Sequence, residues 1–301
     1  MIYARTVDAH GNSSECELAY YFLVAPASGP VSHFPLNEGQ GDTAADTVDT
    51  TRVASADSGL DWTRGRVGGA SGQPHRLEGA AVETSGNSYL ETVDPVIDTT
   101  DSFSVSAWVK LDQTPTGNVT AVAQTGDFQS AFHLGYQYHS NPGWTFKMAP
   151  HDDGPAGASG WTYATDATPA QLGVWTHLLG TYTPDTNRLD LYVDGVHQAS
   201  AHHPTTWNAD GPLAIGGAQH SGSPDYFWPG AIDDVRVWDR VVLDEPLVDD
   251  PDVRSEVWEL ANRPIALEGR WRLDETSGTT VADSSDHGLD GTLNADPATA
   301  W

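Results

Sequence analysis

The stretch GVWTHLLGTYTPDTNRLDLYVDGV, residues 173–196, decides the fold class of this chain. Residues 175–182 alternate bulky apolar side chains with others, which is the period of two expected of a β-strand. Residues 188–193 repeat the alternation after Pro-Asp-Thr-Asn, a combination typical of a turn. Asp194-Gly195 predicts a hairpin, because a type I′ turn needs positive φ at both central residues. The stretch therefore predicts three consecutive antiparallel strands.

A three-stranded meander is marginal on its own in water, so other parts of the chain must cover it. In residues 103–111 the odd-numbered side chains are apolar and share one face, while Trp108 lies on the other. Shorter strand patterns follow the same period of two, at residues 89–93, 121–124, 131–138, 144–148, 213–215 and 231–238.

Three motifs resemble those of the LamG-like jellyroll domains, the laminin G and pentraxin-like branch of the concanavalin A-like lectin/glucanase superfamily. They are FSVSAWV at 103–109, the WTH, GTY and LYVDG pieces of the meander, and GAIDDVRVW at 230–238. The resemblance covers residues 31–248. It implies an all-β jellyroll sandwich of two antiparallel sheets.

Changes in composition predict the boundaries of the other segments. Residues 1–25 resemble the last hairpin of a bacterial immunoglobulin-like or fibronectin-like domain, and residues 26–30 read as a linker. Residues 249–264 predict a short linker helix, with Asp250 as its N-cap and a narrow apolar face.

The C-terminal segment, residues 265–301, contains an internal repeat. RWRLDETSGTTVADSSD at 270–286 aligns without gaps on HFPLNEGQGDTAADTVD at 33–49. A spacing this long is far beyond a solenoid period. The segment therefore predicts the truncated start of a second jellyroll.

The charge of the chain restricts its partners. It carries 42 Asp and Glu but only 14 Lys and Arg, for a net charge of −28, and Lys110 and Lys147 are its only lysines. Nucleic acid and anionic membranes are disfavoured, because both require basic surfaces. No stretch approaches the roughly 18 apolar residues of a membrane span. The chain begins in mid-pattern without a signal peptide, so we expect a piece of a longer secreted or cell-surface protein.

A structural calcium ion is implied by the LamG-like resemblance, between the first loop of the jellyroll and its closing strand. Alternation places Asp233 on the face of Val235 and Val237, toward the interior, where a carboxylate needs a cation or several hydrogen bonds. The alternative is that Asp233 bonds to backbone amides or to Arg236. The candidate metal ligands are Asp46, Asp49, Asp233 and Asp234.

No catalytic site is expected. A retaining glycosidase needs two closely spaced carboxyl groups, yet Glu78, Glu83 and Glu91 are the only glutamates between Glu38 and Glu245. The E-x-D-x-x-E signature of related glycosidases is also missing.

Ligand binding remains open because the chain has eleven Trp and ten Tyr, whose faces stack well on sugar rings. Candidates near Gly-, Pro- and Ser-rich loops are Trp161, Trp207, Tyr226 and Trp228. The alternative is that such loop aromatics cover the core.

Together these features predict a non-catalytic extracellular recognition, adhesion or spacer module with a structural calcium site. The alternatives are a carbohydrate-binding, lectin-like module or an accessory domain of a large secreted enzyme or toxin. The expected partners are a glycan or an extracellular protein and the neighbouring modules of the same chain.

Overall fold

The meander at residues 173–196 forms three adjacent strands, β14 (Thr176–Thr183), β15 (Arg188–Val193) and β16 (Val196–His202). A single 3₁₀ turn, η1 (Pro184–Thr186), joins the first two strands. Asp194 and Gly195 have φ values of 50° and 77°, so both central residues of the second turn are left-handed, as the sequence predicts.

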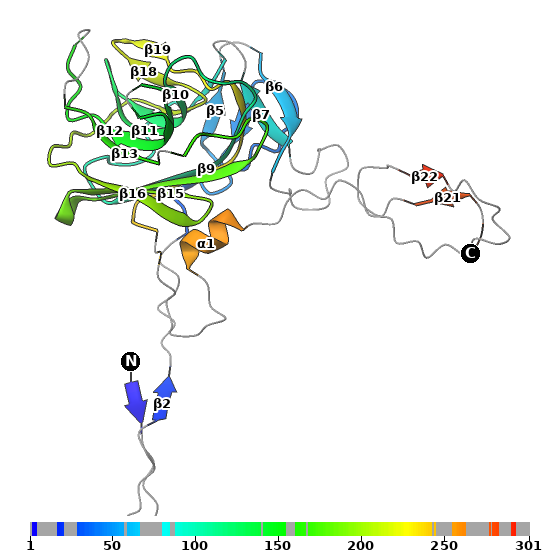
Figure 1. Cartoon of the computed structure of the whole chain (residues 1–301), viewed down its shortest axis with the longest axis horizontal. Helices are drawn as coiled ribbons and strands as arrows, with labels where there is room; N and C mark the ends of the chain where they lie inside the picture. The colour runs from blue at the N-terminus through cyan, green and yellow to red at the C-terminus, as the bar shows by residue number, and fades with distance from the viewer. Residues whose placement is uncertain are drawn as a thin grey trace, which may run out of the picture.

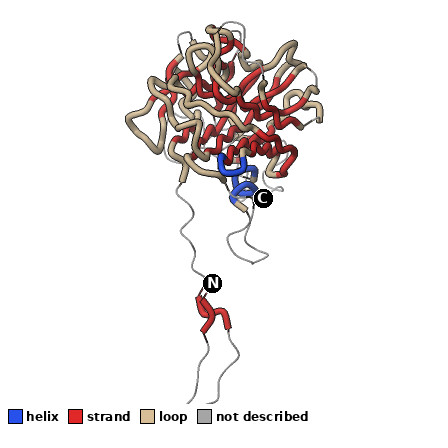
Figure 2. Tube along the Cα trace, turned by 90° about the vertical axis from the view of Figure 1, so that its left-hand side faces the viewer, coloured by secondary structure: helices blue, strands red, loops and turns tan. Residues whose placement is uncertain are grey.

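The computed structural model describes residues 2–4, 17–20, 29–56, 59–66, 80–84, 88–139, 141–154, 160–166, 168–242, 244, 255–262, 277, 279–282 and 290–292. Within them, two large antiparallel sheets pack face to face (Figures 1 and 2). This arrangement confirms the all-β jellyroll sandwich.

The first sheet has the order β16-β15-β14-β9-β20-β7-β6, and β3 also pairs with β20. Its further strands are β9 (Phe103–Leu111), β20 (Gly230–Trp238), β7 (Ala80–Thr84), β6 (Asp61–Arg64) and β3 (Ser32–Phe34). The second sheet has the order β13-β12-β11-β10-β17-β8-β5-β4. Its strands are β13 (Thr162–Thr165), β12 (Gly143–Met148), β11 (Ser130–Gln137), β10 (Val119–Thr125), β17 (Leu213–Ile215), β8 (Leu90–Glu91), β5 (Val53–Ser55) and β4 (Thr43–Ala45).

The core between the sheets is aromatic at its centre. The Phe103 ring lies 5.1 Å from that of Phe132, 6.1 Å from that of Phe146 and 5.9 Å from that of Tyr182. A Cβ at Gly180 would overlap the Phe146 ring, so this position of β14 requires glycine. Because alternate residues of each strand enter the core, the intervening side chains of both sheets lie on outer faces.

Strand β20 departs from regular alternation. Trp108 and Ser106 of β9 are two residues apart, but their partners Asp233 and Arg236 are three apart, so β20 carries a bulge. Asp234 within the bulge has a φ of 50°. Asp233 therefore lies beside Trp108 on the outer face, whereas Val235 belongs to the core. The prediction that Asp233 faces the interior with Val235 is wrong, because the bulge shifts the alternation.

A short helix, α1 (Glu256–Ala261), covers part of the first sheet's outer face (Figure 1). Ser255 is its N-cap and accepts a hydrogen bond from the amide of Trp258, so the described helix begins later than the predicted cap at Asp250, which lies outside the described residues. Its apolar residues join a second apolar cluster made of Leu179, Tyr192, Trp238, Val242, Val257 and Leu260.

Three two-stranded antiparallel pairs complete the described elements: β1 (Ile2–Ala4) with β2 (Glu17–Tyr20), β18 (Ala218–His220) with β19 (Ser223–Asp225), and β21 (Thr280–Val281) with β22 (Gly291–Thr292). Most of the predicted segments 1–25 and 265–301 lies outside the described residues. Across the described part of the chain, no helix is both long enough and apolar enough to cross a bilayer.

Candidate functional site

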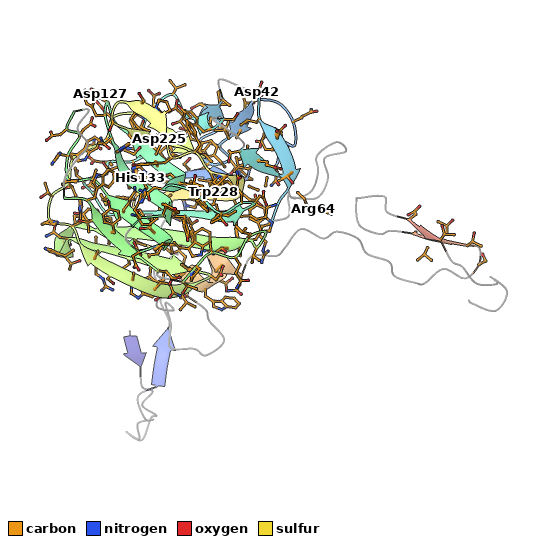
Figure 3. The ribbon with its side chains drawn as sticks, turned by 45° about the horizontal axis from the view of Figure 1, so that its top comes forward. Asp42, Arg64, Asp127, His133, Asp225 and Trp228 are labelled. Atoms are coloured by element: carbon orange, nitrogen blue, oxygen red, sulfur yellow. The ribbon has the colours of Figure 1, made fainter. Side chains whose placement is uncertain are left out.

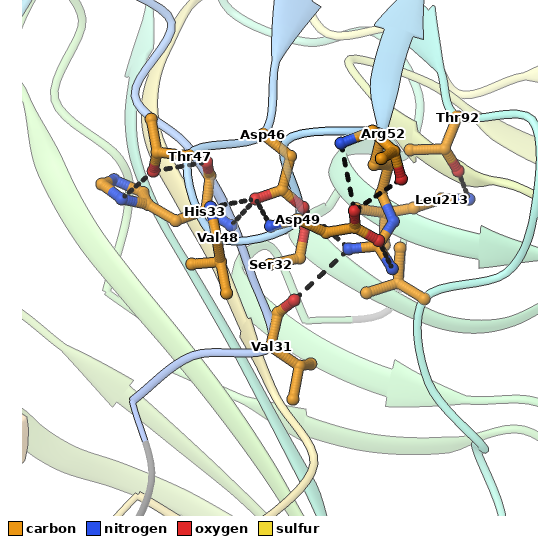
Figure 4. A network of polar contacts seen from close by, with 12 residues as sticks. Val31, Ser32, His33, Asp46, Thr47, Val48, Asp49, Arg52, Thr92 and Leu213 are labelled. Carbon is orange, nitrogen blue, oxygen red and sulfur yellow. Dashed lines mark hydrogen bonds and ion pairs between the residues drawn. The ribbon is translucent and has the colours of Figure 1, made fainter.

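The first of the predicted metal ligands, Asp46, is 2% exposed and its carboxylate is fully engaged by protein donors (Figure 4). Burial raises the pKa of Asp46, but the hydrogen bonds to its carboxylate outweigh this effect and lower the pKa below its usual value. The donors, 2.6–3.2 Å away, are the Ser32 hydroxyl, the amides of His33, Val48 and Asp49, and the Arg52 guanidinium.

The other three carboxylates also have protein partners. Asp49 accepts hydrogen bonds from Thr51 and lies 3.3 Å from the Arg52 guanidinium. Asp234 pairs with Arg236 at 3.1 Å and with Nε2 of His33 at 2.8 Å. On the outer face, Asp233 accepts a 2.6 Å hydrogen bond from the amide of Arg66.

These carboxylates do not fit the calcium ion that the LamG-like resemblance implies. Calcium takes six to eight oxygen ligands, but here Arg52 occupies the cationic position beside Asp46, and Arg236 that beside Asp234. Among the residues that the structure describes, no three His, Cys, Asp or Glu side chains form a group able to hold a metal ion. A calcium requirement stays a prediction, which chelation would test.

The four aromatic candidates separate into three environments. Trp228 is 1% exposed, stacks on Trp144 with ring centroids 6.3 Å apart, and is part of the core, so the expectation that it is exposed is wrong. Trp207 is partly exposed; its indole N–H donates to the carbonyl of Ala149 and its ring packs over Gly126. Trp161 and Tyr226 meet around one lysine on the second sheet.

That lysine, Lys147, stands in a row of side chains that crosses four strands. Ala123, His133, Lys147 and Tyr163 are consecutive cross-strand partners on β10, β11, β12 and β13. Their neighbours along each strand enter the core, so the row lies on the outer face of this sheet. Strand register fixes the spacing of these four positions, of which Tyr163 is exposed while Ala123, His133 and Lys147 are buried.

The Lys147 cluster is defined here as Lys147, His133, Trp161, Tyr163 and Tyr226. The Lys147 ammonium lies 4.9 Å from the Trp161 ring centroid, 5.9 Å from that of Tyr163 and 4.8 Å from that of Tyr226. Each distance is within the range of cation–π attraction. Lys147 is only 4% exposed, and this burial lowers its pKa to about 7.

His133 forms the floor of the Lys147 cluster (labelled in Figure 3). Its ring is fully buried, lies 5.1 Å from that of Trp161 and 5.7 Å from that of Tyr226, and shares a 2.9 Å hydrogen bond with the Thr120 hydroxyl. Burial lowers the pKa of His133 well below its usual value, and the Lys147 charge adds to this effect. Its Nε2 has no hydrogen-bond partner within the described part of the chain.

The backbone holds Tyr226 over Lys147. Tyr226 directly follows β19, has a φ of 56°, and its carbonyl accepts a 2.7 Å hydrogen bond from the amide of Thr120. A left-handed conformation is unfavourable for a tyrosine, so the surrounding contacts must maintain it. The preceding residue, Asp225, is the last residue of β19 and is labelled in Figure 3.

A pocket of about 390 Å³ adjoins the Lys147 cluster and shares Tyr163 with it. Tyr163 is 41% exposed, so part of its ring is available to a ligand. The remaining lining residues are Gln137, His139, Asn141, Thr165, Ala199 and Ser200. Sugar-binding surfaces combine such an aromatic platform with polar side chains at its edge.

Two antiparallel sheets with this strand order and an aromatic outer face define a lectin-like jellyroll. The family model described as the Concanavalin A-like lectin/glucanases superfamily matches residues 84–246, more than half of the chain. The chain therefore belongs to this superfamily. No curated protein matches it in sequence.

Solved structures show the same fold at low sequence identity. Domain 4 of AbnA, an extracellular GH43 arabinanase from Geobacillus stearothermophilus in complex with arabinotriose, is 19% identical with a TM-score of 0.50; the match covers 78% of this chain and 98% of that one. The binding domain of Paraclostridial Mosquitocidal Protein 1 is 11% identical with a TM-score of 0.51, over 78% of this chain and 52% of that one. At these identities the likeness shows the fold alone.

The Lys147 cluster could be predicted only in part. Trp161 and Tyr226 are candidates from the sequence, whereas Lys147, His133 and Tyr163 are not. A signal was present, because Lys147 is one of two lysines in a chain of net charge −28 and alternates with Trp144, Phe146 and Met148. That alternation places the lysine on the face opposite three large apolar side chains.

Proposed function

We propose that this jellyroll is a non-catalytic carbohydrate-binding domain of an extracellular protein. Its binding surface is the outer face of β10–β13, with the Lys147 cluster and the pocket beside Tyr163. The observation that carries the proposal is the exposed ring of Tyr163, which strand register holds beside the buried Lys147 and which lines a pocket with polar side chains at its edge.

The comparisons support carbohydrate as the class of ligand. The superfamily is named for lectins and glucanases, and the arabinanase domain with the same fold was solved with arabinotriose. That enzyme is described as extracellular, and the mosquitocidal protein's matching part is described as a binding domain. These relatives favour an accessory recognition module over a spacer.

The chemistry of the surface favours binding over cleavage. Glycoside hydrolysis by the usual route needs a pair of carboxyl groups on the sugar-binding face. Among the described residues, the side chains of the Lys147 cluster and of the adjoining pocket include no carboxylate. The domain would therefore hold a glycan while another part of the protein acts on it or on the surface that carries it.

A glycan array with the purified chain tests this proposal. We expect Tyr163→Ala and Trp161→Ala to weaken binding up to about tenfold each, the size of a lost aromatic contact of about 1.5 kcal/mol. Trp258→Ala is the matched control, because Trp258 is as exposed as Tyr163 (41% each) but lies on α1, over the other sheet. Failure of the wild-type chain to bind any glycan, or equal losses in the control, would contradict the proposal.

A further inference from the structure

Lys147 differs in its partners from four arginines of this acidic protein. Arg52, Arg188, Arg236 and Arg240 each form an ion pair with a carboxylate at 2.6–3.1 Å. No ion pair in the described part of the chain involves Lys147. A buried ammonium without a carboxylate is costly, so this arrangement needs an explanation.

Lys110, the only other lysine, gives a direct comparison. Its ammonium also lies near an aromatic ring, 5.6 Å from the centroid of Trp175, but it pairs with Asp112 at 3.3 Å and its side chain is 20% exposed. An aromatic neighbour therefore does not remove the need for a counter-charge in this protein. Lys147 has more aromatic contacts but lacks the carboxylate.

The surroundings of Lys147 supply no hidden anion. The rings facing it belong to His133, Trp161, Tyr163 and Tyr226, and burial keeps both tyrosines protonated by raising their pKa values. Asp225, which directly precedes Tyr226 in the chain, accepts a hydrogen bond from the amide of Tyr226. Residues 155–159, which precede Trp161 outside the described part, read Pro-Ala-Gly-Ala-Ser and contain no acid. Among the described residues no acidic side chain thus pairs with the Lys147 ammonium, which leaves the position of a counter-charge to a bound ligand.

We propose that the Lys147 cluster binds an acidic saccharide and that the Lys147 ammonium pairs with its carboxylate or sulfate group. This inference rests on the proposed carbohydrate-binding function and names the class of glycan. Sugar rings would stack on the partly exposed faces of Trp161 and Tyr163, which flank the ammonium. In a chain of net charge −28 an anionic glycan is repelled by most of the surface, so a lone buried lysine also restricts where it binds.

The test compares ligands that differ only in charge. Trigalacturonate and its methyl ester form one pair, and a sulfated trisaccharide with its desulfated form makes the other. Binding to each ligand is measured by calorimetry at pH 6 with the wild-type chain and with the Lys147→Met variant. Methionine has a similar length and no charge, and apolar replacement of a buried charge usually keeps the fold. Lys110→Met is the matched control.

We expect the full chain to bind at least one acidic trisaccharide ten times more tightly than its neutral partner. Lys147→Met should lose this preference, while Lys110→Met keeps it. The pair that shows the preference identifies the group as carboxylate or sulfate. Equal binding of acidic and neutral ligands, or a preference that survives in Lys147→Met, would overturn the acidic-saccharide inference and leave the proposed function standing. Absence of binding to all glycans on the array would overturn both.

Discussion

Two regions of the sandwich treat charge in opposite ways. At one end, Asp46 and Arg52, with Asp234, Arg236 and His33, form a network in which each carboxylate meets a guanidinium. On the outer face of the second sheet, Lys147 is about as buried as Asp46, but it contacts only aromatic rings and a neutral histidine. The acidic first loop, although rich in charge, has its carboxylates satisfied by protein groups. The proposed binding site is instead marked by a buried charge without a carboxylate partner.

The paired network explains why the acidic first loop looks like a metal site in the sequence. A motif of buried aspartates is compatible with calcium, with arginine or with backbone amides, and the spacing does not distinguish them. In the fold, Arg52 reaches Asp46, Asp49 and the carbonyl of Val31 together. The Arg52 guanidinium therefore connects the first loop to the start of β3, as a bound calcium ion would.

The largest expected effect comes from breaking the paired network. Arg52→Met leaves the buried Asp46 carboxylate without its counter-charge, which costs about 3–5 kcal/mol. A loss of 1 kcal/mol lowers the melting temperature of a domain of this size by about 2–4 °C, so the melting temperature should fall by roughly 10 °C. Arg188→Met is the control. Arg188 also pairs with an aspartate, Asp190, but its side chain is 53% exposed, so this ion pair contributes little to the free energy of unfolding. Similar melting temperatures for both variants would show that Arg52 is not the organising cation.

Replacing Lys147 is expected to raise the stability of the folded protein, by less than the loss expected for Arg52→Met. The pKa of Lys147 is lowered to about 7 in the folded protein, below the ordinary value of 10.5. Below pH 7 both folded and unfolded chains hold the proton, so the folded protein bears the full cost of the buried charge. Between pH 7 and 10.5 the unfolded chain binds more protons, and stability rises with pH.

Lys147→Met removes this cost, so the variant should melt several degrees higher than the wild type at pH 6. The gap should narrow by pH 10, where the wild-type lysine is largely neutral in the folded state. Differential scanning calorimetry at the two pH values measures the gap. Lys110→Met, with its ion pair to Asp112, should show no such gap. A Lys147→Met variant less stable than wild type at pH 6 would indicate that the aromatic rings fully compensate the charge.

The smallest expected effect concerns calcium. If the four predicted carboxylates are satisfied by protein groups, EDTA should leave the melting temperature unchanged. A bound ion at a hundredfold excess over its Kd would contribute about 2.7 kcal/mol, which is several degrees in a domain of this size. A fall of that size on chelation, reversed by added calcium, would show that a metal site exists and that Arg52 does not replace it.

The sequence allowed the main strands and the family to be predicted because both rest on local patterns. The meander, β9 and β20 follow from alternation and turn residues. Strands β4, β5 and β13 could not be predicted, because their short sequences TAA, VAS and TYAT consist mainly of small or polar residues and show little apolar alternation.

The sequence-based predictions for Asp233 and Trp228 were wrong because local patterns do not determine the positions of these side chains. The orientation of Asp233 depends on a bulge, and the burial of Trp228 depends on packing against Trp144 from a distant strand. Both are properties of the tertiary structure. The Lys147 cluster was missed for the same reason, because its residues come from 133 to 226 and only the cross-strand register brings them together.

The most direct test of the central claim is the pH dependence of acidic-ligand preference. In the window from pH 6 to pH 8, Lys147 changes from mostly charged to mostly neutral. Its neighbour His133 stays neutral because burial lowers its pKa well below the usual value, and burial also lowers the pKa of His220. Tyr163 and Tyr226 stay protonated because burial raises their pKa values. Asp225 accepts a hydrogen bond from the amide of Tyr226.

The measurement is the ratio of the affinity for the preferred acidic trisaccharide to that for its neutral partner, at the two pH values. The account predicts that the ratio falls up to about tenfold from pH 6 to pH 8 in the wild type and stays near one in Lys147→Met. A ratio that does not change with pH, or that changes equally in the variant, would contradict the claim that Lys147 recognises the ligand.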